Sequence, residues 1–123
     1  MSSVPKPEVT TYPDACSADP QHHQVLYEDD HIRVLRVRYG AHEQSVMHGH
    51  PSTLIIPLTT SKLRYTDYKG HTTVVEAQAW QTMQISVGIH RPENLADKPF
   101  DAIAVELKYR RPTSILGLRR PSN

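Results

Sequence analysis

The stretch SVMHGHPSTLIIPL, residues 45–58, places two histidines just before an apolar run. His48 and His50 are separated by one residue, and in a β-strand such side chains point to the same face. The run that follows is typical of a strand that contributes to a core. Neutral imidazole is a ligand for zinc, iron, copper and nickel. The pair therefore indicates a metal site, if the rest of the chain supplies a scaffold and a third ligand.

The bulk properties describe one small domain. A chain of 123 residues fits a single core, and a formal net charge of +1 gives no reason to expect a nucleic-acid partner. Cys16 is the only cysteine, so no intrachain disulfide is possible and a reducing compartment is expected. No apolar run of membrane-spanning length occurs, and the first residues lack the pattern of a secretory signal. We expect a cytoplasmic protein with no membrane partner.

Three segments follow from composition. Residues 1–23 contain four prolines among small polar residues and predict an extended arm, either loose or strapped along a neighbour. Residues 24–110 predict the folded unit. Residues 111–123 form a basic tail, which we expect to be solvated or packed on a sister subunit rather than bound to nucleic acid.

The central segment has the pattern of an all-β protein. Short runs rich in valine, isoleucine, threonine and tyrosine alternate with turn signals about every ten residues. HIRVLRVRY, residues 31–39, alternates apolar side chains with arginines. No amphipathic helix of ten residues is apparent. The pattern predicts a single small β-barrel, with strands within residues 24–30, 31–39, 52–58, 62–68, 71–77, 80–86, 89–94 and 100–109.

A third histidine stands in SVGIHRPENLADKPF, residues 86–100. His90 follows a turn signal at Gly88 and precedes Asn94 by four positions. In a barrel, a later strand can face the same interior as an earlier one. His48, His50 and His90 would then present three imidazoles to a metal and leave positions open for water or substrate.

The HGH of residues 48–50 and the GIHRPEN of residues 88–94 resemble the two motifs of the cupin superfamily, in particular its small single-domain members. The resemblance covers residues 24–108 and implies a double-stranded β-helix, or jelly-roll, barrel. It implies His48, His50 and His90 as metal ligands and Asn94 as the asparagine that fixes the turn of the second motif. Cupin barrels commonly pair through exchanged N-terminal strands, so the resemblance also implies a homodimer.

The chain departs from the cupin motifs in informative ways. The carboxylate ligand of the family would fall at Leu54 or Ile55, and both are apolar. His42 and Trp80 occupy motif glycine positions, and Ser86 replaces the usual proline. Three neutral imidazoles leave the full charge on a divalent ion, which favours a substrate that binds as an anion.

Some cupins without the motif glutamate are iron dioxygenases, so the resemblance favours an Fe(II)-dependent dioxygenase acting on a small chelating carbonyl compound such as a β-diketone. A redox-neutral cyclase or isomerase with zinc, nickel or manganese is the main alternative. A non-enzymatic barrel that binds a small molecule, with or without metal, also stays open.

Other polar residues have simpler interpretations. We expect His42 in an exposed loop, and His22, His23, His31 and His71 at the surface. Gln84 is a candidate polar group in the cavity. Glu106 alternates with Ile103, Val105 and Leu107, and is either an exposed charge or a partner that holds a ligand histidine. Met47, Leu54, Ile56, Met83 and Ile85 are expected to line the barrel.

Overall fold

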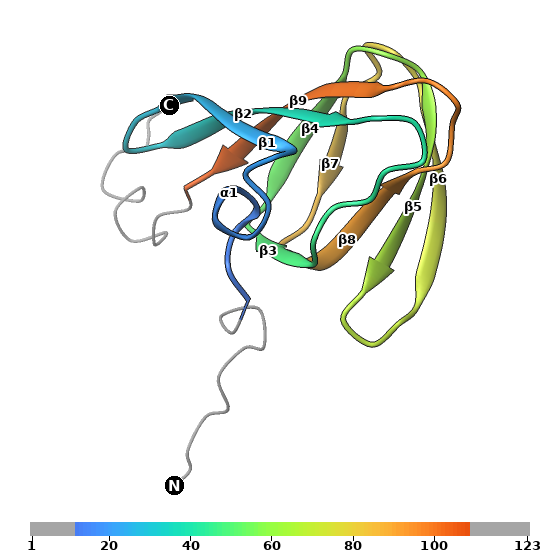
Figure 1. Ribbon diagram of the computed structural model, residues 1–123. Helices are drawn as coiled ribbons and strands as arrows, with labels where there is room; N and C mark the ends of the chain where they lie inside the picture. The colour runs from blue at the N-terminus through green and yellow to red at the C-terminus, as the bar shows by residue number, and fades with distance from the viewer. Residues whose placement is uncertain (1–11, 109–123) are drawn as a thin grey trace, which may run out of the picture.

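The computed structural model describes residues 12–108, and these form two antiparallel sheets that face each other as a barrel (Figure 1). The prediction of an all-β jelly-roll fold is confirmed. In spatial order, the five-stranded sheet consists of β1 (His23–Glu28), β2 (Ile32–Tyr39), β9 (Phe100–Leu107), β4 (Thr53–Pro57) and β7 (Met83–Ile85). The four-stranded sheet consists of β3 (His48–His50), β8 (Gly88–Asn94), β5 (Ser61–Asp67) and β6 (Thr72–Ala77).

Alternation along β2 explains how this strand separates core from solvent. Leu35, Val37 and Tyr39 are buried on the inner face. Arg36 and Arg38 project from the outer face, where both contact the carboxylate of Asp101. These two arginines therefore do not reach the interior of the barrel.

Strand β9 lies between β2 and β4 and lines the interior with small side chains. Ala102 and Ala104 are buried on its inner face, between Phe100 and Glu106. Two consecutive inward alanines fill little volume, so they leave space at the centre of the barrel. This space is where the candidate site lies.

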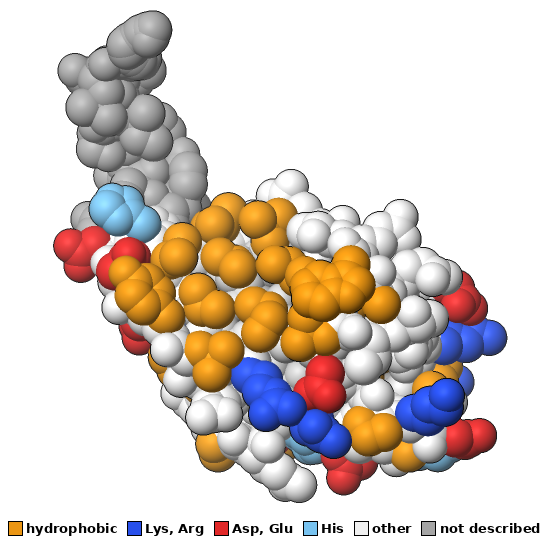
Figure 2. All heavy atoms as spheres, turned by 90° about the horizontal axis from the view of Figure 1, so that it is seen from above, with side chains coloured by type: hydrophobic (Ala, Val, Ile, Leu, Met, Phe, Trp, Pro, Cys, Tyr) orange, Lys and Arg blue, Asp and Glu red, His pale blue; other side chains and the backbone are white. Residues whose placement is uncertain are grey.

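Arg36, Arg38 and Asp101 apart, much of the outer face of the five-stranded sheet is apolar, and Figure 2 shows a broad apolar patch there. Val105 is paired with Val34 on one side and with Leu54 on the other, and Ile103 is paired with Ile56. The expectation that Leu54 and Ile56 line the barrel is therefore wrong. The register turns Thr53 and Ile55 inward instead, and both line the interior cavity.

The segment before β1 differs from the predicted extended arm. Helix α1 (Ala15–Ala18) begins after Asp14, whose side chain accepts a hydrogen bond from the Cys16 amide as an N-cap. The carbonyl of Pro13 accepts a hydrogen bond from the Gly49 amide, at 2.9 Å. This part of the arm thus packs on the barrel of its own chain. Residues 1–11 and the predicted basic tail, residues 111–123, lie outside the described part of the structure.

His42 and Trp80 have positive φ angles, 61° and 69°. Such left-handed backbone is favoured by glycine and costly for other residues. The finding agrees with the resemblance to the cupin motifs, in which both residues stand at glycine positions.

No helix within residues 12–108 is long and apolar enough to cross a bilayer.

Candidate metal centre

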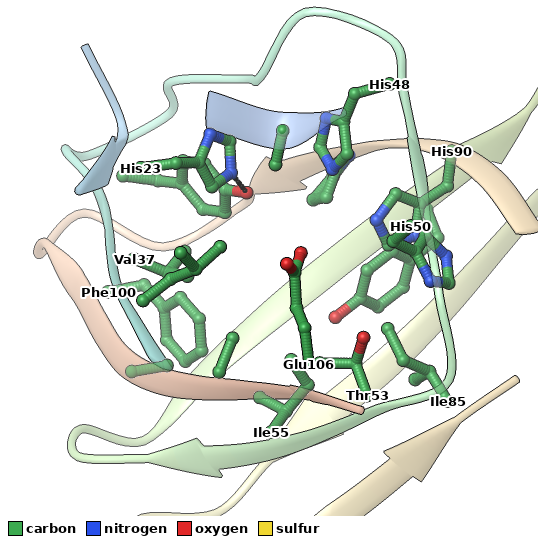
Figure 3. Close-up of a pocket in the computed structure, with 17 residues that line it drawn as sticks. His23, Val37, His48, His50, Thr53, Ile55, Ile85, His90, Phe100 and Glu106 are labelled. Atoms are coloured by element: carbon green, nitrogen blue, oxygen red, sulfur yellow. Dashed lines mark hydrogen bonds between the residues drawn. The ribbon is translucent and has the colours of Figure 1, made fainter. Parts of the chain in front are cut away.

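The pairing of β3 with β8 brings the three predicted ligands together. His48 lies directly opposite His90, and His50 lies opposite Gly88. The ring centroids of His48 and His90 are 4.9 Å apart, and those of His50 and His90 are 4.2 Å apart. All three rings line one interior cavity (Figure 3).

Backbone carbonyls fix the tautomers of two of these histidines. Nδ1 of His48 donates to the Val46 carbonyl at 2.8 Å, and Nδ1 of His50 donates to the Pro51 carbonyl at 2.9 Å. In a neutral ring the proton on Nδ1 leaves the lone pair on Nε2. This is the arrangement that orients histidines as metal ligands. The donor set therefore fits a divalent transition metal.

Burial keeps the three imidazoles neutral near pH 7. It lowers the pKa of His48 to about 4 and also lowers the pKa of His50. Burial, reinforced by the neighbouring His50 and His48, holds the pKa of His90 well below its ordinary value. Neutral imidazole is the form that binds metal.

The rings are neighbours without yet converging on one point. Among residues 12–108, no group of three or more histidine, cysteine, aspartate or glutamate side chains has a ready metal-binding geometry. His90 instead stacks on Tyr65, with ring centroids 5.1 Å apart and an interplanar angle of 21°. Rotation of these side chains would accompany the binding of a metal by all three.

A fourth histidine, His23, borders the same cavity. It is 5% exposed, so its expected surface position is wrong. Its Nδ1 donates to the Asp19 carbonyl, and its Nε2 accepts from the Tyr39 hydroxyl, both at 2.9 Å. Its ring centroid is 5.0 Å from that of His48. Sequence reasoning missed it because β1 has no clear alternation, and only its pairing with Val37 turns His23 inward.

Glu106 also faces the cavity, where it is 4% exposed. In Figure 3 its carboxylate stands in the cavity, between His23 on one side and His50 and His90 on the other. Its Oε1 accepts a 2.7 Å hydrogen bond from Nε of Arg33, whose second nitrogen contacts Asp14. The interpretation as an exposed charge is therefore wrong. Alternation does place Glu106 on the face of the strand opposite to that of Ile103, Val105 and Leu107. It cannot show that the face with these apolar residues is the outer one.

Two other candidates lie away from the cavity. Gln84 is exposed and donates from its side chain to Ser52 Oγ at 3.0 Å, so it is not a cavity residue. His42 is exposed, as expected, and contacts Asp97 at 2.6 Å. His31 and His71 are exposed as expected, while His22 is largely buried between Asp19 and Glu43.

The cavity is small, with a volume of about 50 Å³. One water needs about 10–15 Å³ measured in this way, whereas sites for larger organic ligands run to about 300–1,000 Å³. A hollow of about 630 Å³ lies at the surface, and Glu106 and Arg33 are both among its lining residues. Glu106 therefore separates the small interior cavity from a larger outer hollow.

Solved structures with the same fold are cupins. A cupin domain protein from Bordetella pertussis matches with a TM-score of 0.67 and 19% identity, covering 80% of this chain and 97% of that one. A double-stranded β-helix protein from Klebsiella pneumoniae matches with a TM-score of 0.60 and 17% identity, covering 88% and 91%. An RmlC-like cupin from Methanocaldococcus jannaschii matches with a TM-score of 0.57 and 11% identity, covering 86% and 93%.

No family model matches the chain, and no curated protein matches it in sequence. At these low identities the structural matches establish the fold. The chain has the fold of the small single-domain cupins.

Proposed function

We propose that this protein is a metal-dependent cupin enzyme in which His48, His50 and His90 bind one divalent ion. The observation that carries the proposal is the pair of carbonyl hydrogen bonds at His48 and His50, which direct the proton to Nδ1 and leave Nε2 of each ring as the ligand atom. His90 stands opposite His48 and supplies the third ring.

Fe(II) is the metal we favour, and the reaction is the oxidative cleavage of a small chelating carbonyl compound of the β-diketone type. The carboxylate ligand of the cupin motif would stand at Leu54 or Ile55. Leu54 faces outward and Ile55 is apolar, which supports a ligand set of neutral histidines. A ferrous ion would bind a bidentate substrate and dioxygen. Apolar walls formed by Ile55, Phe100 and Val37 would exclude water from the bound substrate.

Cavity size limits the substrate. About 50 Å³ accommodates only a few non-hydrogen atoms beside a metal. A compact chelate therefore suits the cavity, and a larger substrate would require movement of the wall that Glu106 forms with the outer hollow.

A redox-neutral reaction is the second candidate, because the cavity contains a buried carboxylate. Glu106 can accept a proton, and proton transfer is the step that isomerases and cyclases catalyse. Zinc, nickel or manganese would then act as a Lewis acid toward the substrate.

Metal analysis with oxygen uptake distinguishes these functions. Protein purified without an affinity tag is assayed for metals, then reconstituted with Fe(II) under anaerobic conditions and given a panel of β-diketones. Stoichiometric iron with substrate-dependent oxygen consumption supports the dioxygenase. Tightly bound zinc or nickel without oxygen uptake supports the redox-neutral enzyme. Failure of every divalent metal to bind would leave a barrel that binds small molecules without metal.

A further inference from the structure

We propose that Glu106 is a catalytic proton acceptor. In this role its free oxygen takes the proton that a weakly acidic substrate loses when it binds as an anion beside the histidines. This inference rests on the proposed metal site and adds to it the class of substrate, a compound with an acidic C–H, O–H or N–H next to its metal-binding atom.

The position of Glu106 is costly in terms of stability alone. The other inner side chains of β9 are Phe100, Ala102 and Ala104, so an apolar residue would continue the pattern. Taking a carboxylate and a guanidinium out of water has a desolvation cost, and buried ion pairs are often no more stabilising than apolar residues of the same size. A functional reason for the charge is therefore indicated.

The ion pair leaves one carboxylate oxygen free. Arg33 binds Oε1, and no hydrogen bond joins Oε2 to any group within residues 12–108. Arg33 lines the outer hollow but not the interior cavity, so it approaches the carboxylate from behind. Asp14 accepts a hydrogen bond from Nη2 of the same guanidinium at 2.7 Å. The carboxylate is thus fixed on one side and open to the cavity on the other (Figure 3).

The other polar groups of the cavity cannot take a proton from substrate. In the proposed site, each of His48, His50 and His90 uses one nitrogen for the metal and carries its ring proton on the other, and in His48 and His50 that proton is donated to a carbonyl. Both nitrogens of His23 are engaged, one by the Asp19 carbonyl and one by the Tyr39 hydroxyl. Burial raises the pKa of Tyr65 to about 12, so its phenol stays protonated. Glu106 is the remaining base among the described residues that line the cavity.

The proton transfer balances without a further reactant. The X–H bond of the substrate breaks, its electron pair stays on X as the anion, and a new O–H bond forms at Oε2 of Glu106. The carboxylate becomes neutral, while Arg33 keeps a counter-charge in Asp14. Since Oε2 faces the interior cavity, the proton can return from it to the product.

Proton release on ligand binding tests the inference directly. Zinc-loaded wild type and Glu106→Gln are titrated at pH 7 with acetohydroxamic acid, a neutral acid that chelates as an anion, and with formate, which is already an anion. Calorimetry in two buffers of different ionisation enthalpy gives the protons released per ligand bound. We expect wild type to release close to zero protons per molecule of acetohydroxamic acid bound, and Glu106→Gln to release close to one. With formate, the number of protons released should be the same for the two proteins.

Two controls keep the outcomes separate. Asp101→Asn lies on the outer face of the same strand and should behave as wild type. The double variant Arg33→Met with Glu106→Gln removes both charges of the pair, and it replaces the single variant if that does not fold.

Release of a full proton by wild type would overturn the proton-acceptor role while leaving the metal site intact. A loss of zinc affinity of about 100-fold or more in Glu106→Gln would overturn it in favour of direct ligation. Absence of zinc binding in wild type would instead refute the metal site, and the inference with it.

Discussion

His48 and His90 are paired directly across β3 and β8, with ring centroids 4.9 Å apart. The register of the two strands therefore brings together two histidines that are far apart in the sequence. His50 extends the cluster because side chains two positions apart share a face, and its ring lies 4.2 Å from that of His90. The position of the cluster inside the barrel follows from backbone pairing, which should persist when any one ring is removed.

The metal-free protein should lose stability as pH falls from about 6.5 to about 4. Folding lowers the pKa of His48 from 6.5 to about 4, so the unfolded chain binds its proton at the higher pH. The stability this histidine contributes is fully present above pH 6.5 and is lost as pH falls through 4, by up to about 1.4 kcal/mol per pH unit. His50, His90 and His23 act in the same direction, because their pKa values are also lowered.

Urea unfolding midpoints between pH 7 and pH 4 measure this dependence. His48→Gln should reduce the slope. An equal slope in His48→Gln and wild type would show that the imidazole of His48 is not buried in neutral form.

Asn94 should be one of the most sensitive positions of the barrel. Its side-chain amide nitrogen donates to the carbonyls of Tyr39, Gly40 and Lys98, and its Oδ1 accepts from Ser61. Asn94→Ala leaves these groups unsatisfied inside the protein and should lower the free energy of unfolding by about 3 kcal/mol. Ser61→Ala removes one contact and should cost about 1 kcal/mol. Chemical denaturation compares the free energies of unfolding of the two variants. Similar losses in both would mean that the hydrogen bonds of Asn94 to the three carbonyls do not stabilise the turn of the second motif.

Trp80→Gly should stabilise the protein. The φ angle of Trp80 is 69°, and the side chain is 71% exposed, so little packing is lost. Left-handed backbone costs a non-glycine residue about 1–2 kcal/mol, while glycine loses about 0.5–1 kcal/mol more entropy on folding. The net gain should be about 0.5–1 kcal/mol by thermal or urea unfolding. Trp80→Ala is the matched control and should show no such gain, since alanine keeps the strained backbone.

Much of this architecture could be predicted from the sequence. Short alternating runs gave the strands, and the spacing of His48, His50 and His90 gave the candidate ligands that β3 and β8 bring together. Alternation separates two faces but does not say which is inner. For that reason the pattern does not show that Leu54 faces outward or that Glu106 is buried.

The helix and the fourth histidine depend on longer-range contacts. Helix α1 has four residues, which is too short for a periodic pattern, and it depends on the cap at Asp14 and the contact of Pro13 with Gly49. His23 is turned inward by its pairing with β2, a register that its own strand does not encode.

The homodimer expected from the sequence stays a prediction. The described part of the chain offers a wide apolar surface for such contact, the outer face of the five-stranded sheet (Figure 2). Light scattering coupled to size-exclusion chromatography should give twice the mass of one chain. Ile103→Glu on this face should then give the mass of a monomer. Val74→Glu, at an exposed position of the other sheet, should change nothing. A monomeric wild type would refute the prediction.

The central claim is that three histidines bind one divalent metal, and zinc competition with a chromophoric chelator tests it most directly. Wild type should bind one zinc ion per chain. His90→Ala should lower the affinity by at least about 100-fold while the circular dichroism spectrum of the barrel is retained. His42→Ala, an exposed histidine away from the cavity, should bind as wild type does. Undiminished zinc affinity in His90→Ala would contradict the three-histidine site.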